Sequence, residues 1–151
     1  MSLLGYHGFN NWENHFMEDE NERDNILFGF ELEAREDDSN YVENQLSPEQ
    51  VACKLGEEFG NLFVYERDSS IGRGVEIISQ PMTMNYYMAH IDLFKKLLKM
   101  LDKMNYVSTK GNKCGLHIHF NRKALGYNSK EFETLKNKVG NLRKANNLDH
   151  E

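Results

Sequence analysis

The segment from Ile26 to Ala34 constrains the fold most, because its side chains alternate between two kinds along the chain. Its apolar residues are Phe28, Phe30 and Leu32, and the positions between them are Gly29, Glu31 and Glu33. A period of two residues is typical of a β-strand with one face against a hydrophobic layer. We therefore expect a strand that places phenylalanines on its inner face and two carboxylates on its outer face.

The remaining segments alternate between helical and strand patterns. Ser47 is an N-cap residue followed by proline at the first helical position and by Gln50, so a helix should extend to Phe59 and end at Gly60. We expect further strands at 62–67, 75–79, 106–110 and 115–121, helices at 83–104 and 129–146, and a turn at 68–74 that makes a hairpin. This order predicts an α+β domain with helices packed on one face of an antiparallel sheet.

The chain of 151 residues has a length typical of one domain. Residues 1–25 combine aromatic side chains with an acidic run and show no period, so we expect a partly ordered arm before a single domain at 26–151. Cys53 and Cys114 are too few for a disulfide framework, and both are interpreted as buried small apolar residues.

Charge and hydropathy narrow the choice of partners. The formal net charge is −6, whereas a protein that binds nucleic acid through its phosphates is usually basic. No apolar run approaches the roughly 20 residues that span a bilayer, and the first residues lack the pattern of a secretory signal. We expect a cytoplasmic protein that binds neither nucleic acid nor a membrane.

Three expected strands carry side chains that can bind metal ions at alternate positions. These residues are Glu31 and Glu33, then Glu76, then His117 and His119. Side chains two apart in a strand share a face, so each pair can reach one cation or two adjacent ones. Carboxylates together with imidazoles favour Mg²⁺ or Mn²⁺, with Zn²⁺ as an alternative. The alternative interpretations are a solvated polar face for the glutamates at 31 and 33 and for the histidines, and a rim position for Glu76.

Three segments resemble, in their order and spacing, the signature blocks of the amidoligase family, which is related to glutamine synthetase and glutamate–cysteine ligase and includes phage and bacterial members. The segments are Phe28-Gly-Phe-Glu-Leu-Glu33, then Asp68-Ser-Ser-Ile-Gly-Arg-Gly-Val-Glu-Ile-Ile-Ser-Gln-Pro-Met82, then Cys114-Gly-Leu-His-Ile-His-Phe120. The resemblance implies half of a glutamine synthetase-like catalytic domain, whose sheet holds divalent ions that bind ATP phosphates. For a phage protein, the cytoplasm is that of the bacterial host.

The activity that this resemblance implies is ATP-dependent amide formation between a small-molecule or peptide carboxylate and an amine, through an acyl phosphate. The implied metal residues are Glu31, Glu33, Glu76, His117 and His119. Glu33, Glu76 and Arg73 would be catalytic, and Asp68 and Arg73 would bind the nucleotide. No glycine-rich phosphate loop of the usual spacing is present, so ATP follows from the resemblance alone.

Members of that family continue well beyond the strand with paired histidines, whereas one expected helix follows it here. We therefore expect a domain truncated at its C-terminus, or one completed by a homodimer or a second chain, because an incomplete sheet leaves an edge strand open. Two other functions stay open: a non-catalytic remnant of the fold that binds a partner or a metal, and a metal-dependent hydrolase.

Overall fold

The computed structural model describes residues 3–5, 14–108 and 114–121 of the chain. By their contacts the residues form two compact units, Met1–His119 and Phe120–Glu151. The first unit holds the sheet and all the helices described below. Of the second unit, the structure describes Phe120 and Asn121.

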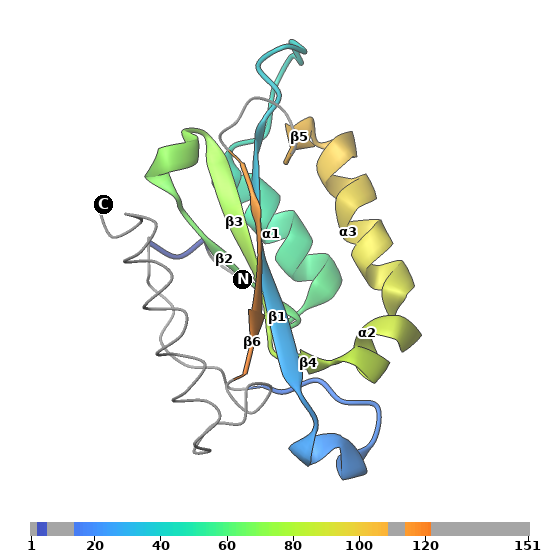
Figure 1. Ribbon diagram of the computed structural model, residues 1–151. Helices are drawn as coiled ribbons and strands as arrows, with labels where there is room; N and C mark the ends of the chain where they lie inside the picture. Colours follow the sequence, from blue (N-terminus) through green and yellow to red (C-terminus); the bar gives the residue numbers. More distant parts are fainter. Residues whose placement is uncertain (1–2, 6–13, 109–113, 122–151) are drawn as a thin grey trace, which may run out of the picture. The chain divides into compact units, whose positions relative to one another are not determined.

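In the described part of the chain, six strands form one sheet around β1, which spans Leu27–Glu36. β1 pairs with β3 (Gly74–Ser79) and with β4 (Met82–Thr83), and β3 pairs in turn with β2 (Phe63–Glu66). The strands β5 (Tyr106–Val107) and β6 (Leu116–Phe120) also pair with β1. Arg35 pairs with Gly74 on one edge and with Val107 on the other, so β1 is an interior strand (Figure 1).

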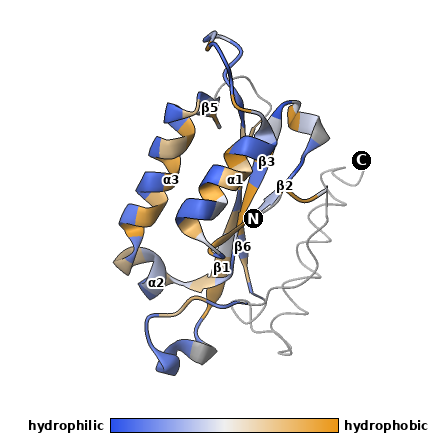
Figure 2. Ribbon diagram, turned by 180° about the vertical axis from the view of Figure 1, so that it is seen from behind, coloured by the Kyte–Doolittle hydropathy of each residue, from blue (hydrophilic) through white to orange (hydrophobic). Residues whose placement is uncertain are grey.

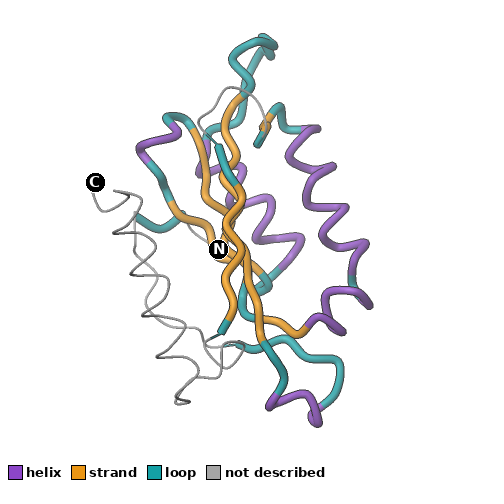
Figure 3. The backbone as a smooth tube through the Cα atoms, viewed as in Figure 1, coloured by secondary structure: helices purple, strands orange, loops and turns teal. Residues whose placement is uncertain are grey.

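The helices pack on one face of this sheet (Figures 1 and 3). They are α1 (Pro48–Phe59), α2 (Met84–Ala89) and α3 (Ile91–Lys103), with short 3-10 turns at Glu20–Asp24 and Ser69–Ile71. Figure 2 shows hydrophobic and hydrophilic segments alternating along α1 and α3, as expected for helices with one buried side. In the described residues, no helix is long and apolar enough to cross a membrane.

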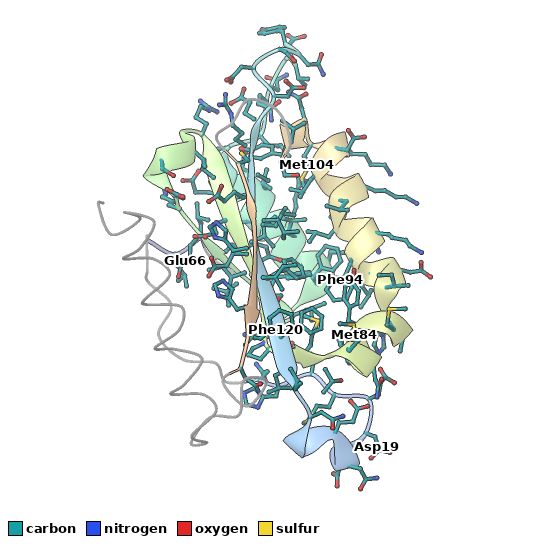
Figure 4. The ribbon with its side chains drawn as sticks, viewed as in Figure 1. Asp19, Glu66, Met84, Phe94, Met104 and Phe120 are labelled. Carbon is teal, nitrogen blue, oxygen red and sulfur yellow. The ribbon has the colours of Figure 1, made fainter. Side chains whose placement is uncertain are left out.

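An aromatic cluster joins the helices to the sheet. The centroid of the Phe94 ring in α3 lies 5.9 Å from that of Phe30 and 6.0 Å from that of Phe63. Both pairs of rings are arranged edge to face. Figure 4 shows Phe94 between α3 and the sheet, and Glu66 away from this layer. The inner face is therefore apolar, and the opposite face of the same strands is left to polar side chains.

Several sequence predictions are confirmed. The sheet is antiparallel where its register is defined, and 63–66 and 74–79 form the expected hairpin. Ser47 and Gln50 form a capping box, and Gly60 ends α1 with a positive φ of 58°. The inward direction of Phe30 agrees with its ring contacts.

Other predictions are wrong in detail. The helix expected at 83–104 is divided at His90, which has a ψ of 21°. At this position the His90 imidazole forms an ion pair with Glu18, and its ring contacts the ring of Tyr86. The strand expected at 106–110 is confined to Tyr106 and Val107 among the described residues. Cys53 is exposed and Cys114 is partly exposed, so neither is a core residue. The helix expected at 129–146 lies outside the described residues.

The described part of the N-terminal segment contacts the sheet. Leu4 forms a parallel bridge with Glu66, and Phe16 forms one with Met82. The carboxylate of Glu22 accepts hydrogen bonds from the Thr83 hydroxyl and the Asn85 amide. These contacts attach residues 14–25 to the start of α2.

Candidate metal centre

Three neighbouring strands place glutamates directly opposite one another. In the register of the sheet, Glu76 of β3 pairs with Glu33 of β1 on one side and with Glu66 of β2 on the other. Residues directly opposite in antiparallel strands point to the same face, with Cβ atoms about 4.5–5.5 Å apart. We call this line of Glu33, Glu76 and Glu66 the carboxylate row. It lies on the sheet face opposite the helices.

Glu76, in the centre of this row, is a buried carboxylate with a raised pKa. Only 8% of the surface of Glu76 is exposed to solvent. Burial raises its pKa, and the neighbouring charges of Glu31, Asp68, Glu66 and Glu33 raise it further, in that order. A buried carboxylate among like charges is costly unless a cation or hydrogen-bond donors compensate it. In the part of the chain that the structure describes, no hydrogen bond or ion pair reaches the Glu76 carboxylate.

The two histidines of β6 share one carboxylate. Nδ1 of His117 lies 3.2 Å from Oε2 of Glu31, and Nε2 of His119 lies 3.1 Å from Oε1 of the same residue. Both imidazoles are more than half exposed, whereas the Glu31 side chain is 26% exposed. The alternation predicted for 115–121 therefore places both histidines on the face of Glu31.

Glu33 is attached to the beginning of the same segment. Its backbone N–H donates to the carbonyl of Gly115 at 3.1 Å, and its carboxylate accepts from the N–H of Gly115 at 2.7 Å. The pairing of β6 with β1 therefore holds Glu33 and the two histidines close to one another. The site is built from residues of β1, β2, β3 and β6.

Asp68 and Arg73, both in the turn before β3, have different surroundings. Asp68 is buried, accepts a hydrogen bond from the N–H of Ser70, and is close enough to raise the pKa of Glu76. Arg73 instead forms an ion pair with Glu36 at 2.8 Å and influences the pKa of Tyr106, which belongs to the hydrophobic core. The structure therefore brings Asp68 to the row and does not bring Arg73 there.

Carboxylate oxygens are typical ligands of Mg²⁺ and Mn²⁺, whereas imidazole nitrogens are typical ligands of Zn²⁺ and other transition metals. In the described ranges, no three of these groups converge closely enough to hold an ion as they stand. Mg²⁺ commonly takes one or two protein carboxylates and completes its shell with water and substrate phosphates.

Glu66 is the site residue that the sequence did not reveal. It lies beside Tyr65 in a short strand with all four residues buried, so no apolar–polar alternation marks it. The register of β2 against β3, which pairs Glu66 with Glu76, identifies it. The signal in the sequence was an acidic residue two positions before Asp68, in a segment expected to be a strand.

Comparison with protein-family models, curated proteins and solved structures finds no match to this chain. The fold is therefore described as α+β with an antiparallel sheet. Any closer relationship depends on the three sequence segments given above.

Proposed function

We propose that this chain binds Mg²⁺ or Mn²⁺ on the carboxylate face of its sheet and uses it to bind ATP, in an amide-forming reaction between a carboxylate and an amine. The observation that carries the proposal is the position of Glu76, which is buried between two glutamates on neighbouring strands. Burial among like charges is unfavourable for the Glu76 carboxylate unless a cation or hydrogen-bond donors compensate it.

Glu33, Glu76 and the histidine pair are the residues that would hold the cation. When bound there, it would neutralise charge on the ATP phosphates and orient them. The row itself is too acidic to attract a triphosphate. In the described part of the chain, Arg35 pairs with Asp38 and Arg73 with Glu36, which leaves both guanidinium groups engaged away from Glu76.

The proposed reaction has two steps. An oxygen of the substrate carboxylate attacks the γ-phosphorus of ATP, which forms an acyl phosphate and releases ADP. The amine nitrogen then attacks the acyl carbon, and the carbon–oxygen bond to phosphate breaks. The products are an amide and inorganic phosphate, and the nitrogen loses one proton. Glu76 would accept that proton if the substrate amine lay over the row, because burial and the neighbouring carboxylates raise its pKa.

The first experiment tests whether the chain binds ATP together with the cation. A non-hydrolysable ATP analogue should be titrated calorimetrically into the protein with Mn²⁺ and with a chelator. We expect binding with Mn²⁺ only, and a loss of binding in Glu33→Ala and His119→Ala. Glu43→Ala is the matched control, because Glu43 is exposed and outside the site.

Each outcome separates the proposed ligase from another class of protein. Nucleotide binding that survives both site substitutions would place the nucleotide elsewhere and contradict the proposal. Mn²⁺ binding without nucleotide binding would instead favour a metal-dependent hydrolase, in which a bound water is the nucleophile. Absence of both would favour a non-catalytic protein of the same fold.

A further inference from the structure

Two carboxylates of the N-terminal segment contact the two ends of α2. At the beginning of the helix, Glu22 accepts a hydrogen bond of 2.5 Å from the hydroxyl of Thr83, the N-cap residue. At its end, Oε1 of Glu18 lies 2.6 Å from Nε2 of His90, the C-cap residue. We call residues 14–25 the strap. It therefore reaches α2 at both of its caps.

These contacts of the strap are joined to one another. The carboxylate of Glu22 also accepts from the side-chain amide of Asn85 and, at 3.3 Å, from the backbone N–H of Glu18. The two carboxylate residues are thus bonded to each other. The ring of Phe16 lies 5.2 Å from that of Tyr86, in the middle of α2. The strap therefore contacts the helix along its whole length.

α2 depends on these contacts, because it has little stability of its own. It spans six residues, and none of them is buried. Helices this short are unstable alone, since few backbone hydrogen bonds offset the cost of starting a helix. The cap involves the strap as well: the Thr83 hydroxyl accepts from the N–H of Tyr86 at 3.2 Å while it donates to Glu22. By contrast, α3 has 13 residues and buries three apolar side chains.

Backbone geometry sets the limits of the region that the strap controls. At one limit, the N–H of Phe16 donates to the carbonyl of Pro81, and the carbonyl of Phe16 accepts from the N–H of Thr83. These bonds attach the strap to β4. At the other limit, His90 has a non-helical ψ of 21°, and α3 begins at the next residue. His90 therefore separates a weakly packed helix from a well-packed one.

We propose that the strap and α2 form a latch, which opens and closes as one unit at His90 while α1, α3 and the rest of the sheet stay folded. An element with few buried contacts beside well-packed ones opens locally before the whole protein unfolds. Opening separates the rings of Phe16 and Tyr86, which are half-buried in the closed latch. The latch involves none of the proposed metal residues, so it stands or falls independently of the proposed function.

Native-state hydrogen exchange of the full chain tests the latch. The reporter amides are those of Thr83, Tyr86 and His90, each of which donates a hydrogen bond. Glu22→Gln acts at the beginning of α2, and Glu18→Gln acts at its end. We expect each variant to speed exchange at all three amides by one common factor. This factor should be roughly 10- to 100-fold for Glu22→Gln, which loses hydrogen bonds to a charged group, and about 2- to 5-fold for Glu18→Gln, which loses a partly exposed ion pair.

The exchange of amides in α1 and α3 is the internal control, because it should stay unchanged in both variants. Glu20→Gln is the matched control variant, since Glu20 lies in the strap and is exposed. Faster exchange only at the end of α2 nearest each substitution would overturn the latch and show two independent contacts. Equal acceleration in α1 and α3 would overturn it as well, because α2 would then open only with the whole protein. No acceleration in Glu22→Gln would also contradict it.

Discussion

Replacing Glu76 by glutamine should stabilise the metal-free protein at neutral pH, although it changes a buried residue in the centre of the sheet. Glutamine has nearly the same shape as glutamate and carries no charge. The substitution therefore removes the repulsion from the glutamates on both sides while the packing of β3 is kept. Most substitutions of buried residues are destabilising, so the expected sign is itself informative.

The magnitude follows from the register. Glu76 has one like charge directly opposite on each neighbouring strand, Glu33 and Glu66. Each cross-strand pair of this kind changes stability by roughly 0.2–1 kcal/mol, so removing both should contribute about 0.5–2 kcal/mol. For a chain of this length, that corresponds to an increase of about 1–8 °C in the melting temperature.

The pH dependence provides a second test. Because burial and neighbouring carboxylates raise the pKa of Glu76, the folded state keeps this proton to a higher pH than the unfolded state does. The contribution of Glu76 to the free energy of unfolding therefore falls as pH rises from the ordinary value of 4.5 through the higher pKa of the folded state. The advantage of Glu76→Gln should be full above this interval and absent below it.

Thermal unfolding with a chelator, at neutral pH and at a pH below 4.5, measures both effects. Glu43→Gln, an exposed glutamate outside the site, is the matched control and should change little at either pH. A melting temperature of Glu76→Gln that is equal to or lower than that of the wild type at neutral pH would refute the reasoning. Addition of Mn²⁺ should raise the melting temperature of the wild type more than that of the variant.

Three further predictions concern the fold. Phe94→Ala should lower the free energy of unfolding by about 3–5 kcal/mol in a denaturant titration, because its ring fills the layer between α3 and the sheet; a loss below 1 kcal/mol would contradict this packing. Gly74→Ala should cost about 1–3 kcal/mol, because the new methyl group would overlap the Ile71 side chain at 2.4 Å, and an unchanged midpoint would argue against that turn. Ser47→Ala should cost about 1 kcal/mol through loss of the capping box, and a similar loss in Gln50→Ala would show that both halves of the box contribute.

The parts of the fold that the sequence predicted are those that local patterns control. The alternation in 26–34, the capping residues before α1 and the glycine after it each depend on neighbours within a few positions. The same is true of the histidine pair, whose shared face follows from their spacing. These residues were found because the local period and the tertiary contacts agree.

The remaining parts depend on contacts between distant segments. The break at His90 coincides with bonds to Glu18, which is 72 positions earlier, and the sequence contains no glycine or proline there. The strands at 106–107 and 116–120 follow one another in the sequence, yet both pair with the distant β1 in the described structure. Glu66 joins the carboxylate row only through the register of β2 against β3. Arg73 was expected at the phosphates, and its ion pair with Glu36 became visible only in the structure.

The most direct test of the central claim is a titration of the wild-type chain with Mn²⁺, followed by the electron paramagnetic resonance signal of the free ion. If the carboxylate row and the paired histidines form a cation site, the protein will remove Mn²⁺ from solution saturably. Glu76→Gln and Glu33→Gln will then weaken the binding, and Glu43→Gln will leave it unchanged. Absence of saturable binding to the wild type, or equal binding by all four proteins, would contradict the account.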